Sequence, residues 1–415
     1  MHLAVFSETI TYILLFLTLY WEVFLLMTFL EKKGQIQKEE SMILSDFPAV
    51  TVLVPCFNEE STISSTIESL LSLNYPKDKL EILIIDDGST DQTLSVAKKF
   101  EIESNVRVYH KENGGKFTAL NFGLDLTRTE FVGCLDADSF VHPDALKNLM
   151  PYFTDPKTMA VTPSLKIYNP NSSVIRMIQN VEYNLGIFVR KISSLLNAIY
   201  VTPGPFSIFR MQVYRDLGRY HHAHNTEDME MALRMQSHHY RIVNAHKAVV
   251  YTVGPKTLPK LYKQRVRWTH GFLENIKDYR HLILNPKYGN LGLLILPLAF
   301  VSFFATLYLV LVSYYGLVRI IIKDVIQIQT VGFHPAWQSL HFSWFFVNTA
   351  TLSIINVLIA FLTLIIIFAG KRLAGVKDRR VMDLVYSFFL YSFIAPLWLT
   401  KAFYNSLFSR RTPWR

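Results

Sequence analysis

The sequence predicts an α/β domain placed between hydrophobic segments that are long enough to cross a membrane. Three observations lead to this fold class. First, 50% of the 415 residues are hydrophobic and 14% are aromatic, which is more apolar than an ordinary soluble protein. Second, the middle of the chain carries too many charges for a membrane segment, and short apolar strands alternate there with helical patterns. Third, long apolar runs lie on both sides of that middle region.

The first apolar run covers residues 9–30 and contains one charged side chain, Glu22. It is long enough to span a bilayer as a helix. A cleaved signal peptide is the alternative, but residues 1–8 carry no Lys or Arg and no small-x-small cleavage site follows. The Glu-Lys-Lys sequence at 31–33 places the end of the run on the cytoplasmic side. We therefore expect residues 1–32 to form an uncleaved anchor, in which Glu22 faces a helix bundle or another polar partner.

Residues 48–255 are expected to form a cytosolic domain with a central sheet. The expected strands are residues 50–54, 80–85, 106–109 and 131–135. Between the first two, apolar side chains repeat at helical spacing over residues 59–73. Such strand–helix–strand repetition predicts a doubly wound sheet, which binds its ligands at the carboxyl ends of the strands.

Two later segments mix apolar and basic side chains. Residues 173–199 and residues 256–288 both have the composition of helices that lie in the headgroup plane of a membrane. A surface helix of the α/β domain is the alternative for 173–199. Neither segment is apolar enough to be a simple span.

Three apolar runs follow toward the C-terminus. Residues 291–318 and 344–369 are strong candidates for transmembrane helices. The third run, residues 383–406, is interrupted by Pro396 and Lys401, so it either spans the membrane or forms a kinked interfacial helix.

The net charge of +9 has two explanations, a cationic binding surface or the basic flanks of membrane spans. We favour the flanks, because basic residues cluster beside the apolar runs and no nucleic-acid motif is present. The two cysteines, Cys56 and Cys134, have no metal-ligand spacing and fall in predicted core strands. They are expected to be buried thiols in a reduced compartment.

Acidic motifs follow two of the predicted strands. Asp86-Asp87-Gly88-Ser89 closes the strand at 80–85, and its carboxylates can accept hydrogen bonds from a uracil or a ribose. Asp136-Ala137-Asp138 follows the strand at 131–135. Carboxylates at this spacing can hold Mg²⁺ or Mn²⁺, which in turn binds a diphosphate. Each motif is weak when taken alone, because both also occur as ordinary turns.

Three further motifs add groups that suit a sugar nucleotide. Asn113-Gly114-Gly115-Lys116 opens a predicted helix, where glycines allow close backbone approach and Lys116 adds a cation for phosphate. Thr226-Glu227-Asp228 supplies carboxylates, although Thr226 can also be a helix N-cap. Gln264, Arg267 and Trp268 share one helix face, and Trp268 offers either a flat surface for a sugar ring or a membrane-interface anchor.

These motifs, in this order, resemble those of glycosyltransferase family 2, and residues 54–60 resemble the family's first strand and turn. The Thr-Glu-Asp and Gln-x-x-Arg-Trp motifs are similar to those of its processive membrane branch, which includes cellulose, chitin, hyaluronan and poly-N-acetylglucosamine synthases. The resemblance covers roughly residues 48–270. It implies a GT-A-like nucleotide-diphospho-sugar transferase fold, an inverting reaction, a UDP-sugar donor, and Mg²⁺ or Mn²⁺ as cofactor.

The resemblance also implies roles for individual residues. Asp228 corresponds to the family's catalytic base, with Glu227 beside it as a second catalytic carboxylate, and Asp136 and Asp138 would bind the metal. Arg267 and the metal would offset the charge on the leaving diphosphate. The expected substrate-binding residues are Asp86, Asp87, Lys116, Asp136, Thr226, Gln264, Arg267 and Trp268.

Some features bear on the subtype. The segment at 202–207 has two prolines where relatives often carry a glycine-rich stretch that lines the acceptor pocket. The histidines at 221, 222 and 224 are interpreted as a polar loop rather than a metal site. One N-terminal span and a short tail make the layout most similar to the poly-N-acetylglucosamine synthases.

We therefore expect a membrane-embedded enzyme that polymerises a UDP-sugar, with UDP-N-acetylglucosamine as the best match, and helps to export the polysaccharide. The expected partners are the donor, the growing polysaccharide, membrane lipid, and either a small membrane subunit or a second copy of the chain; nucleic acid is not expected. The expected location is the cell membrane, with the catalytic domain in the cytoplasm. The alternatives are a non-processive lipid glycosyltransferase and a non-catalytic membrane scaffold.

Overall fold

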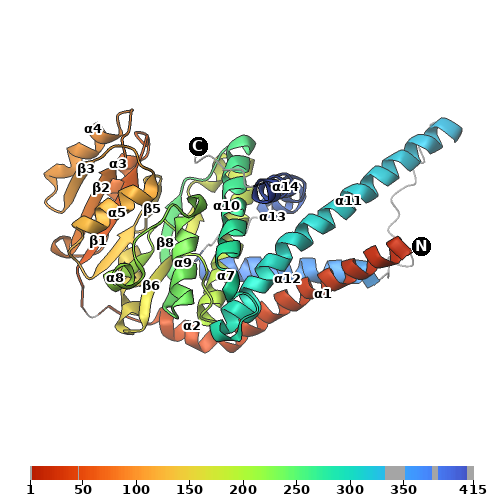
Figure 1. Ribbon diagram of the computed structural model, residues 1–415, viewed down its shortest axis with the longest axis horizontal. Helices are drawn as coiled ribbons and strands as arrows, with labels where there is room; N and C mark the ends of the chain where they lie inside the picture. Colours follow the sequence, from red (N-terminus) through yellow and green to blue (C-terminus); the bar gives the residue numbers. More distant parts are fainter. Residues whose placement is uncertain (1, 45, 332–350, 376–381, 409–415) are drawn as a thin grey trace. The chain divides into compact units, whose positions relative to one another are not determined.

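The computed structural model describes residues 2–44, 46–331, 351–375 and 382–408 (Figure 1). The chain divides into two compact units. One combines residues 1–27 with residues 298–366, and the larger one combines residues 28–297 with residues 367–415. The larger unit contains the whole sheet and all of the sequence motifs described above.

The larger unit is built on an eight-stranded sheet in the order β3-β2-β1-β4-β7-β6-β8-β5. The strands are β1 Val50–Cys56, β2 Leu80–Asp86, β3 Val106–His110, β4 Phe131–Cys134, β5 Ser139–Val141, β6 Thr158–Ile167, β7 Ile208–Arg210 and β8 Arg241–Thr252. The four strands expected from the sequence are confirmed as β1 to β4, and they are parallel to one another.

The second half of the domain departs from the parallel pairing of β1 to β4. There β7 is antiparallel to both β4 and β6, and β5 is antiparallel to β8, so the sheet is mixed. The reversal comes from β7, which has only three residues and therefore gives no hydrophobic periodicity in the sequence.

Helices cover both faces of the sheet (Figure 1). Those of the larger unit are α2 Lys33–Glu40, α3 Ile63–Leu71, α4 Thr93–Lys98, α5 Lys116–Leu126, α6 Ala145–Leu149, α7 Val174–Leu195, α8 Met211–Leu217, α9 Glu227–Ser237, α10 Leu258–Asp278, α13 Met382–Tyr386 and α14 Ser392–Leu407. Along β1, Val52 and Val54 pack in the core that contains α3, whereas Leu53 packs in the core that contains α5. Because both faces are covered, β1 is hydrophobic at nearly every position.

Helix α7 contains most of residues 173–199, for which the sequence predicts either an interfacial helix or a surface helix of the α/β domain. Its N-cap is Ser173, whose hydroxyl accepts a hydrogen bond from the Arg176 amide. One face, including Ile187 and Phe188, is buried, and Lys191 on that face donates to the Asn244 carbonyl of β8 at 3.1 Å. The structure therefore makes α7 a packed helix of the α/β domain.

The smaller unit consists of apolar helices. Among the described residues, three helical segments are long and apolar enough to cross a membrane: Thr9–Glu31, Leu291–Thr330 and Thr351–Leu373. Helix α1 is His2–Glu31, α11 is Leu296–Val331 and α12 is Thr351–Leu373, so the helix expected at 291–318 continues well beyond 318. Residues 344–350 of the next expected span lie outside the described residues. Within this unit, Glu22 of α1 accepts a hydrogen bond from Thr363 of α12.

The last expected run, residues 383–406, folds as α13, a π-helical turn at Ser387–Tyr391 and α14, with Pro396 inside α14. Helix α14 packs against α10, where Ala395 and Trp398 are buried together with Leu261 and Val266. This run is not among the candidate spans found in the described part of the chain.

Candidate active site

The carboxyl end of β2 presents the two aspartates of the first acidic motif. Asp86 is buried and hydrogen-bonds to Nδ1 of His110 at 2.7 Å. Asp87 accepts from the amides of Gly114 and Gly115 at 3.1 and 2.8 Å, and from the Lys111 amine at 2.6 Å. Asp87 therefore holds the glycine turn in place. Gly115 has a φ of 92°, a conformation that side chains rarely adopt, which explains the glycine at this position.

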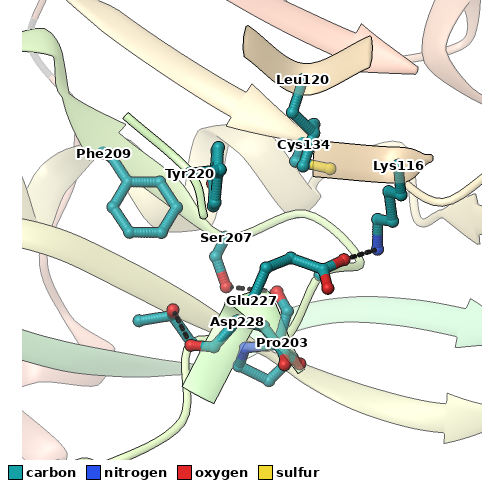
Figure 2. A pocket seen from close by; sticks show the side chains of 11 residues that line it. Lys116, Leu120, Cys134, Pro203, Ser207, Phe209, Tyr220, Glu227 and Asp228 are labelled. Atoms are coloured by element: carbon teal, nitrogen blue, oxygen red, sulfur yellow. Dashed lines mark hydrogen bonds and ion pairs between the residues drawn. The ribbon is translucent and has the colours of Figure 1, made fainter. Parts of the chain in front are cut away.

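Lys116 joins two of the acidic motifs from the start of α5. Its amine lies 2.6 Å from Oδ1 of Asp136 and 3.3 Å from Oε1 of Glu227. Burial alone would lower the pKa of Lys116, but the carboxylates of Asp136 and Glu227 hold it well above its usual value. Figure 2 shows this amine pointing toward the Glu227 carboxylate. The site thus contains a permanently charged lysine between two carboxylates.

Gly204 packs directly over the Lys116–Asp136 ion pair. A Cβ at this position would lie 2.9 Å from the lysine Nζ and 3.2 Å from both carboxylate oxygens of Asp136. The segment at 202–207 is therefore part of the site, and a side chain at position 204 would have to displace the Lys116 amine.

The second acidic motif can hold a divalent cation. Burial raises the pKa of Asp138 to about 7, and the neighbouring charges of Asp136 and Glu59 add to this effect. A cation placed between Asp136 and Asp138 would relieve that repulsion, and carboxylate oxygens suit Mg²⁺ and Mn²⁺. In the residues that the structure describes, no group of three or more His, Cys, Asp or Glu side chains forms a complete metal site. The two aspartates therefore fit an ion that also takes ligands from a bound phosphate and water.

Asp228 is the second residue of α9 and is held through its backbone. Its carbonyl accepts a hydrogen bond from the Thr202 hydroxyl at 2.8 Å, and its Oδ1 accepts from the Met229 amide at 2.9 Å. Burial raises the pKa of Asp228 to about 6, and the nearby Glu227 charge contributes to the increase. At neutral pH the group is ionised but readily protonated, which is the property of a general base.

One pocket brings Lys116, Glu227 and Asp228 together (Figure 2). The other site residues expected from the sequence are not part of its lining: Asp86, Asp87, Asp136, Asp138, Thr226, Gln264, Arg267 and Trp268. Its polar lining consists of Lys116, Thr202, Ser207, Glu227 and Asp228, and its apolar lining includes Leu120, Cys134, Phe209 and Tyr220. The sequence predicts Lys116, Glu227 and Asp228 as site residues, but it does not predict the apolar wall. The position of Cys134 could have indicated one residue of this wall, because Cys134 ends β4 only two residues before Asp136.

The Gln-x-x-Arg-Trp motif lies on α10 beside the third acidic motif. Arg267 donates to the Asn225 carbonyl at 3.1 Å, close to the start of α9. Trp268 is 36% exposed. Arg265, which the sequence analysis did not single out, is 3% exposed and places its guanidinium 4.3 Å from the centre of the Trp268 ring. Its Nη2 also lies 2.7 Å from the Glu182 carboxylate of α7, so a partly buried ion pair lies on one side of the tryptophan.

Comparisons with known proteins identify the family of the chain. Residues 51–218 match the family model described as glycosyl transferase family 2. The poly-beta-1,6-N-acetyl-D-glucosamine synthase of Staphylococcus epidermidis is 30% identical over 351 residues, covering 83% of this chain and 81% of that protein. The chain belongs to glycosyltransferase family 2. A protein of the same name from Staphylococcus aureus is 33% identical over 261 residues, and the alignment spans 63% of its length.

A solved glycosyltransferase structure shares the fold of this chain over most of its length. The mannosyltransferase PcManGT from Pyrobaculum calidifontis, in complex with GDP-Man and Mn²⁺, aligns with a TM-score of 0.59 at 18% identity. The alignment covers 96% of this chain and 99% of the mannosyltransferase. The expected GT-A-like fold with apolar helices at both ends is thus confirmed, and the chain is a glycosyltransferase.

Helix α10 makes a close contact with the Thr-Glu-Asp motif. A Cβ on Gly271 would lie 2.4 Å from Cγ2 and Oγ1 of Thr226, and the Asn275 amide donates to that Oγ1 at 2.9 Å. We expect Gly271→Ala to lower the transfer rate by about tenfold to 10²-fold, because it displaces the start of α9 and with it Asp228. Turnover is measured as UDP release.

Helix propensity cannot explain such a loss, since alanine is favoured over glycine in a helix by about 1 kcal/mol. Gly34→Ala in α2 is the matched control, because no atom lies within 4 Å of its Cβ position. Equal rates for the two variants would show that the Gly271 contact does not position the motif.

Proposed function

We propose that this family 2 glycosyltransferase is an inverting enzyme that polymerises UDP-N-acetylglucosamine into a polysaccharide at a membrane. The observation that carries the proposal is the pocket in which Asp228, a carboxylate with a raised pKa, lies beside the Lys116 cation. The names of the two staphylococcal relatives support the choice of sugar. The three apolar helices support the membrane location, with the catalytic domain in the cytoplasm.

In the proposed reaction, a hydroxyl oxygen of the acceptor attacks C1 of the donor sugar. The new bond to C1 forms as the bond from C1 to the phosphate oxygen breaks, and UDP leaves with that electron pair. Asp228 takes the hydroxyl proton. Lys116 and Arg267 supply positive charge near the departing diphosphate. Asp136 and Asp138 would hold a divalent cation, which supplies further charge stabilisation when bound.

The remaining groups have supporting roles in this proposal. Asp86 is assigned to the nucleoside end of the donor, while Asp87 shapes the glycine turn next to it. Glu227 keeps the Lys116 amine close to Asp228. Trp268 is assigned to a sugar ring of the acceptor, since its ring is partly exposed and fixed by Arg265. Gln264, whose Oε1 has no partner among the described residues, is assigned to an acceptor hydroxyl.

The direct test is incubation of the full chain, purified in detergent, with a panel of UDP-sugars and Mg²⁺ or Mn²⁺. UDP release and product length are recorded together. Long polymer from UDP-N-acetylglucosamine is the expected result. Addition of only one or two sugars to a lipid would favour the non-processive alternative. If UDP were released from none of the UDP-sugars, the proposal would be contradicted. Size analysis of the active preparation tests for a small membrane subunit or a second copy.

The raised pKa of Asp228 predicts a pH dependence. Asp228 accepts a proton only when ionised, and with a pKa of about 6 its ionised fraction falls as the pH drops through 6. We expect kcat/KM for transfer to fall by about tenfold per pH unit below pH 6. Above pH 7, where Asp228 is ionised, its titration should cause no further change in kcat/KM. An acid limb centred near pH 4, the usual carboxyl range, would contradict the assignment.

A further inference from the structure

Helix α9 carries a buried ion pair in the turns that follow the Thr-Glu-Asp motif. Glu230 and Arg234 are 7% and 6% exposed. Arg234 donates from Nε to Oε1 of Glu230 at 2.9 Å and from Nη2 to the other carboxylate oxygen, so the pairing is bidentate. The hydroxyl of Tyr279, the residue at the C-terminal end of α10, donates to the same Oε1 at 2.6 Å. The sequence motifs include none of these three residues.

The third nitrogen of Arg234 reaches from α9 to a neighbouring turn. Its Nη1 donates to the carbonyl oxygens of Leu217 and Arg219 at 2.9 Å and lies 3.3 Å from that of Gly218. Leu217 is the last residue of α8. The last carbonyls of a helix lack intrahelical partners and carry partial negative charge, so a guanidinium is a suitable partner for them. The turn is thus fixed by one arginine from another helix, and Glu230 sets the orientation of that arginine.

Tyr220 is the next residue of this turn, and its ring lies at the pocket. The Tyr220 amide donates to Oδ1 of Asn121 at 3.0 Å, and the Tyr220 carbonyl accepts from Nδ2 of Asn121 at 2.9 Å. The hydroxyls of Tyr220 and Tyr214 hydrogen-bond to each other at 2.7 Å. The ring held by these contacts forms part of the apolar wall of the pocket (Figure 2).

The turn separates the pocket from solvent at this point of the wall. Gly218, Arg219 and His221 are exposed, whereas Tyr220 between them is only 6% exposed. The pocket that Tyr220 lines also contains Asp228. One inward side chain of an exposed turn therefore lies between water and the pocket that holds the proposed base.

Water is a competing acceptor in glycosyl transfer. Its oxygen would form the new bond to C1 as the bond from C1 to the phosphate oxygen breaks, and UDP would leave with that electron pair. Asp228 would take the water proton, because a base that activates an acceptor hydroxyl can also activate water. Hydrolysis of the donor is prevented when the closed site excludes water from the reacting carbon.

We propose that Arg234 is a positioning residue that holds Tyr220 in the pocket wall, so that the enzyme transfers the sugar to its acceptor rather than to water. Arg234 acts through the turn and not on the reacting atoms. Glu230 and Tyr279 act one step further away, by orienting the guanidinium. This inference goes beyond the proposed function and rests on it for the identity of the donor.

Arg234→Lys tests the position of the turn while keeping the positive charge. A lysine amine cannot replace a guanidinium that binds a carboxylate in bidentate fashion and a row of carbonyls at once. UDP released from UDP-N-acetylglucosamine and sugar incorporated into product are measured in the same sample. We expect the ratio of released UDP to incorporated sugar to rise by about fivefold to tenfold, with free N-acetylglucosamine accounting for the difference. Arg219→Lys is the matched control, because that arginine lies in the same turn but pairs with Asp125 at the surface.

Tyr220→Ala removes the wall itself and should raise the ratio at least as much. Tyr240→Ala is its control, since Tyr240 packs against the same hydrophobic core but is not part of the pocket lining. Partial misfolding lowers both measured quantities together and leaves their ratio unchanged, and Arg234→Lys decides the matter if Tyr220→Ala does not fold. An unchanged ratio with lower total turnover would overturn the proposal and make Arg234 a purely structural residue. Failure of the proposed function is distinguishable, because the wild-type chain would then form no polymer.

Discussion

Asp228→Asn is expected to reduce glycosyl transfer by about 10²–10⁴-fold, the contribution typical of a general base. The amide has the same shape and can still accept the hydrogen bond from the Met229 amide, so the start of α9 should keep its geometry. What is lost is the ability to take a proton. UDP affinity, measured by calorimetry or a fluorescent analogue, should change by no more than about threefold, because the proposed nucleotide contacts are elsewhere.

The same variant should also lose the acid limb of the pH profile, because the group responsible for that limb no longer titrates. Asp216→Asn is a suitable control, since that exposed carboxylate accepts from the Tyr240 hydroxyl and is not part of the pocket lining. If Asp228→Asn retained transfer within about tenfold of the wild type, the base would have to be sought elsewhere, and Glu227 would be the first candidate.

The parallel half of the fold was predictable because it depends on local sequence. The strands from β1 to β4 are short apolar runs, and the turn residues that follow them mark where each strand ends. The aspartates at those ends therefore had a predictable place in the sheet. The motif order then supplied Lys116, Glu227 and Asp228, which the structure brings into one pocket.

The remaining features depend on contacts between distant segments. The three residues of β7 take their direction from pairing with β4 and β6. Arg265 is one of several basic residues in its helix, and only packing against Trp268 and Glu182 distinguishes it. Side-chain periodicity carries no information on such contacts.

Lys191→Met is expected to lower the free energy of unfolding of the larger unit by about 3–5 kcal/mol, the cost typical of removing one partner of a buried ion pair. Lys191 on α7 is 0% exposed, pairs with Glu39 of α2, and donates to the Asn244 carbonyl at 3.1 Å. Without the amine, Oε2 of Glu39 would lose its ion-pair partner and that carbonyl would lose a donor, while Oε1 of Glu39 would keep its hydrogen bond from Gln35. Denaturant unfolding in detergent, followed by tryptophan fluorescence, would measure the change.

Lys247→Met is the matched control for this prediction. Its side chain is 48% exposed and lies 3.6 Å from Glu40, the neighbour of Glu39 on α2, so its loss should cost about 1 kcal/mol or less. The double variant Glu39→Leu with Lys191→Met should recover much of the stability, because an apolar pair often replaces a buried ion pair without loss. A double variant as unstable as Lys191→Met alone would mean that packing around the lysine stem, rather than the unpaired carboxylate, sets the cost. Recovery would show that the unpaired Glu39 carboxylate sets the cost.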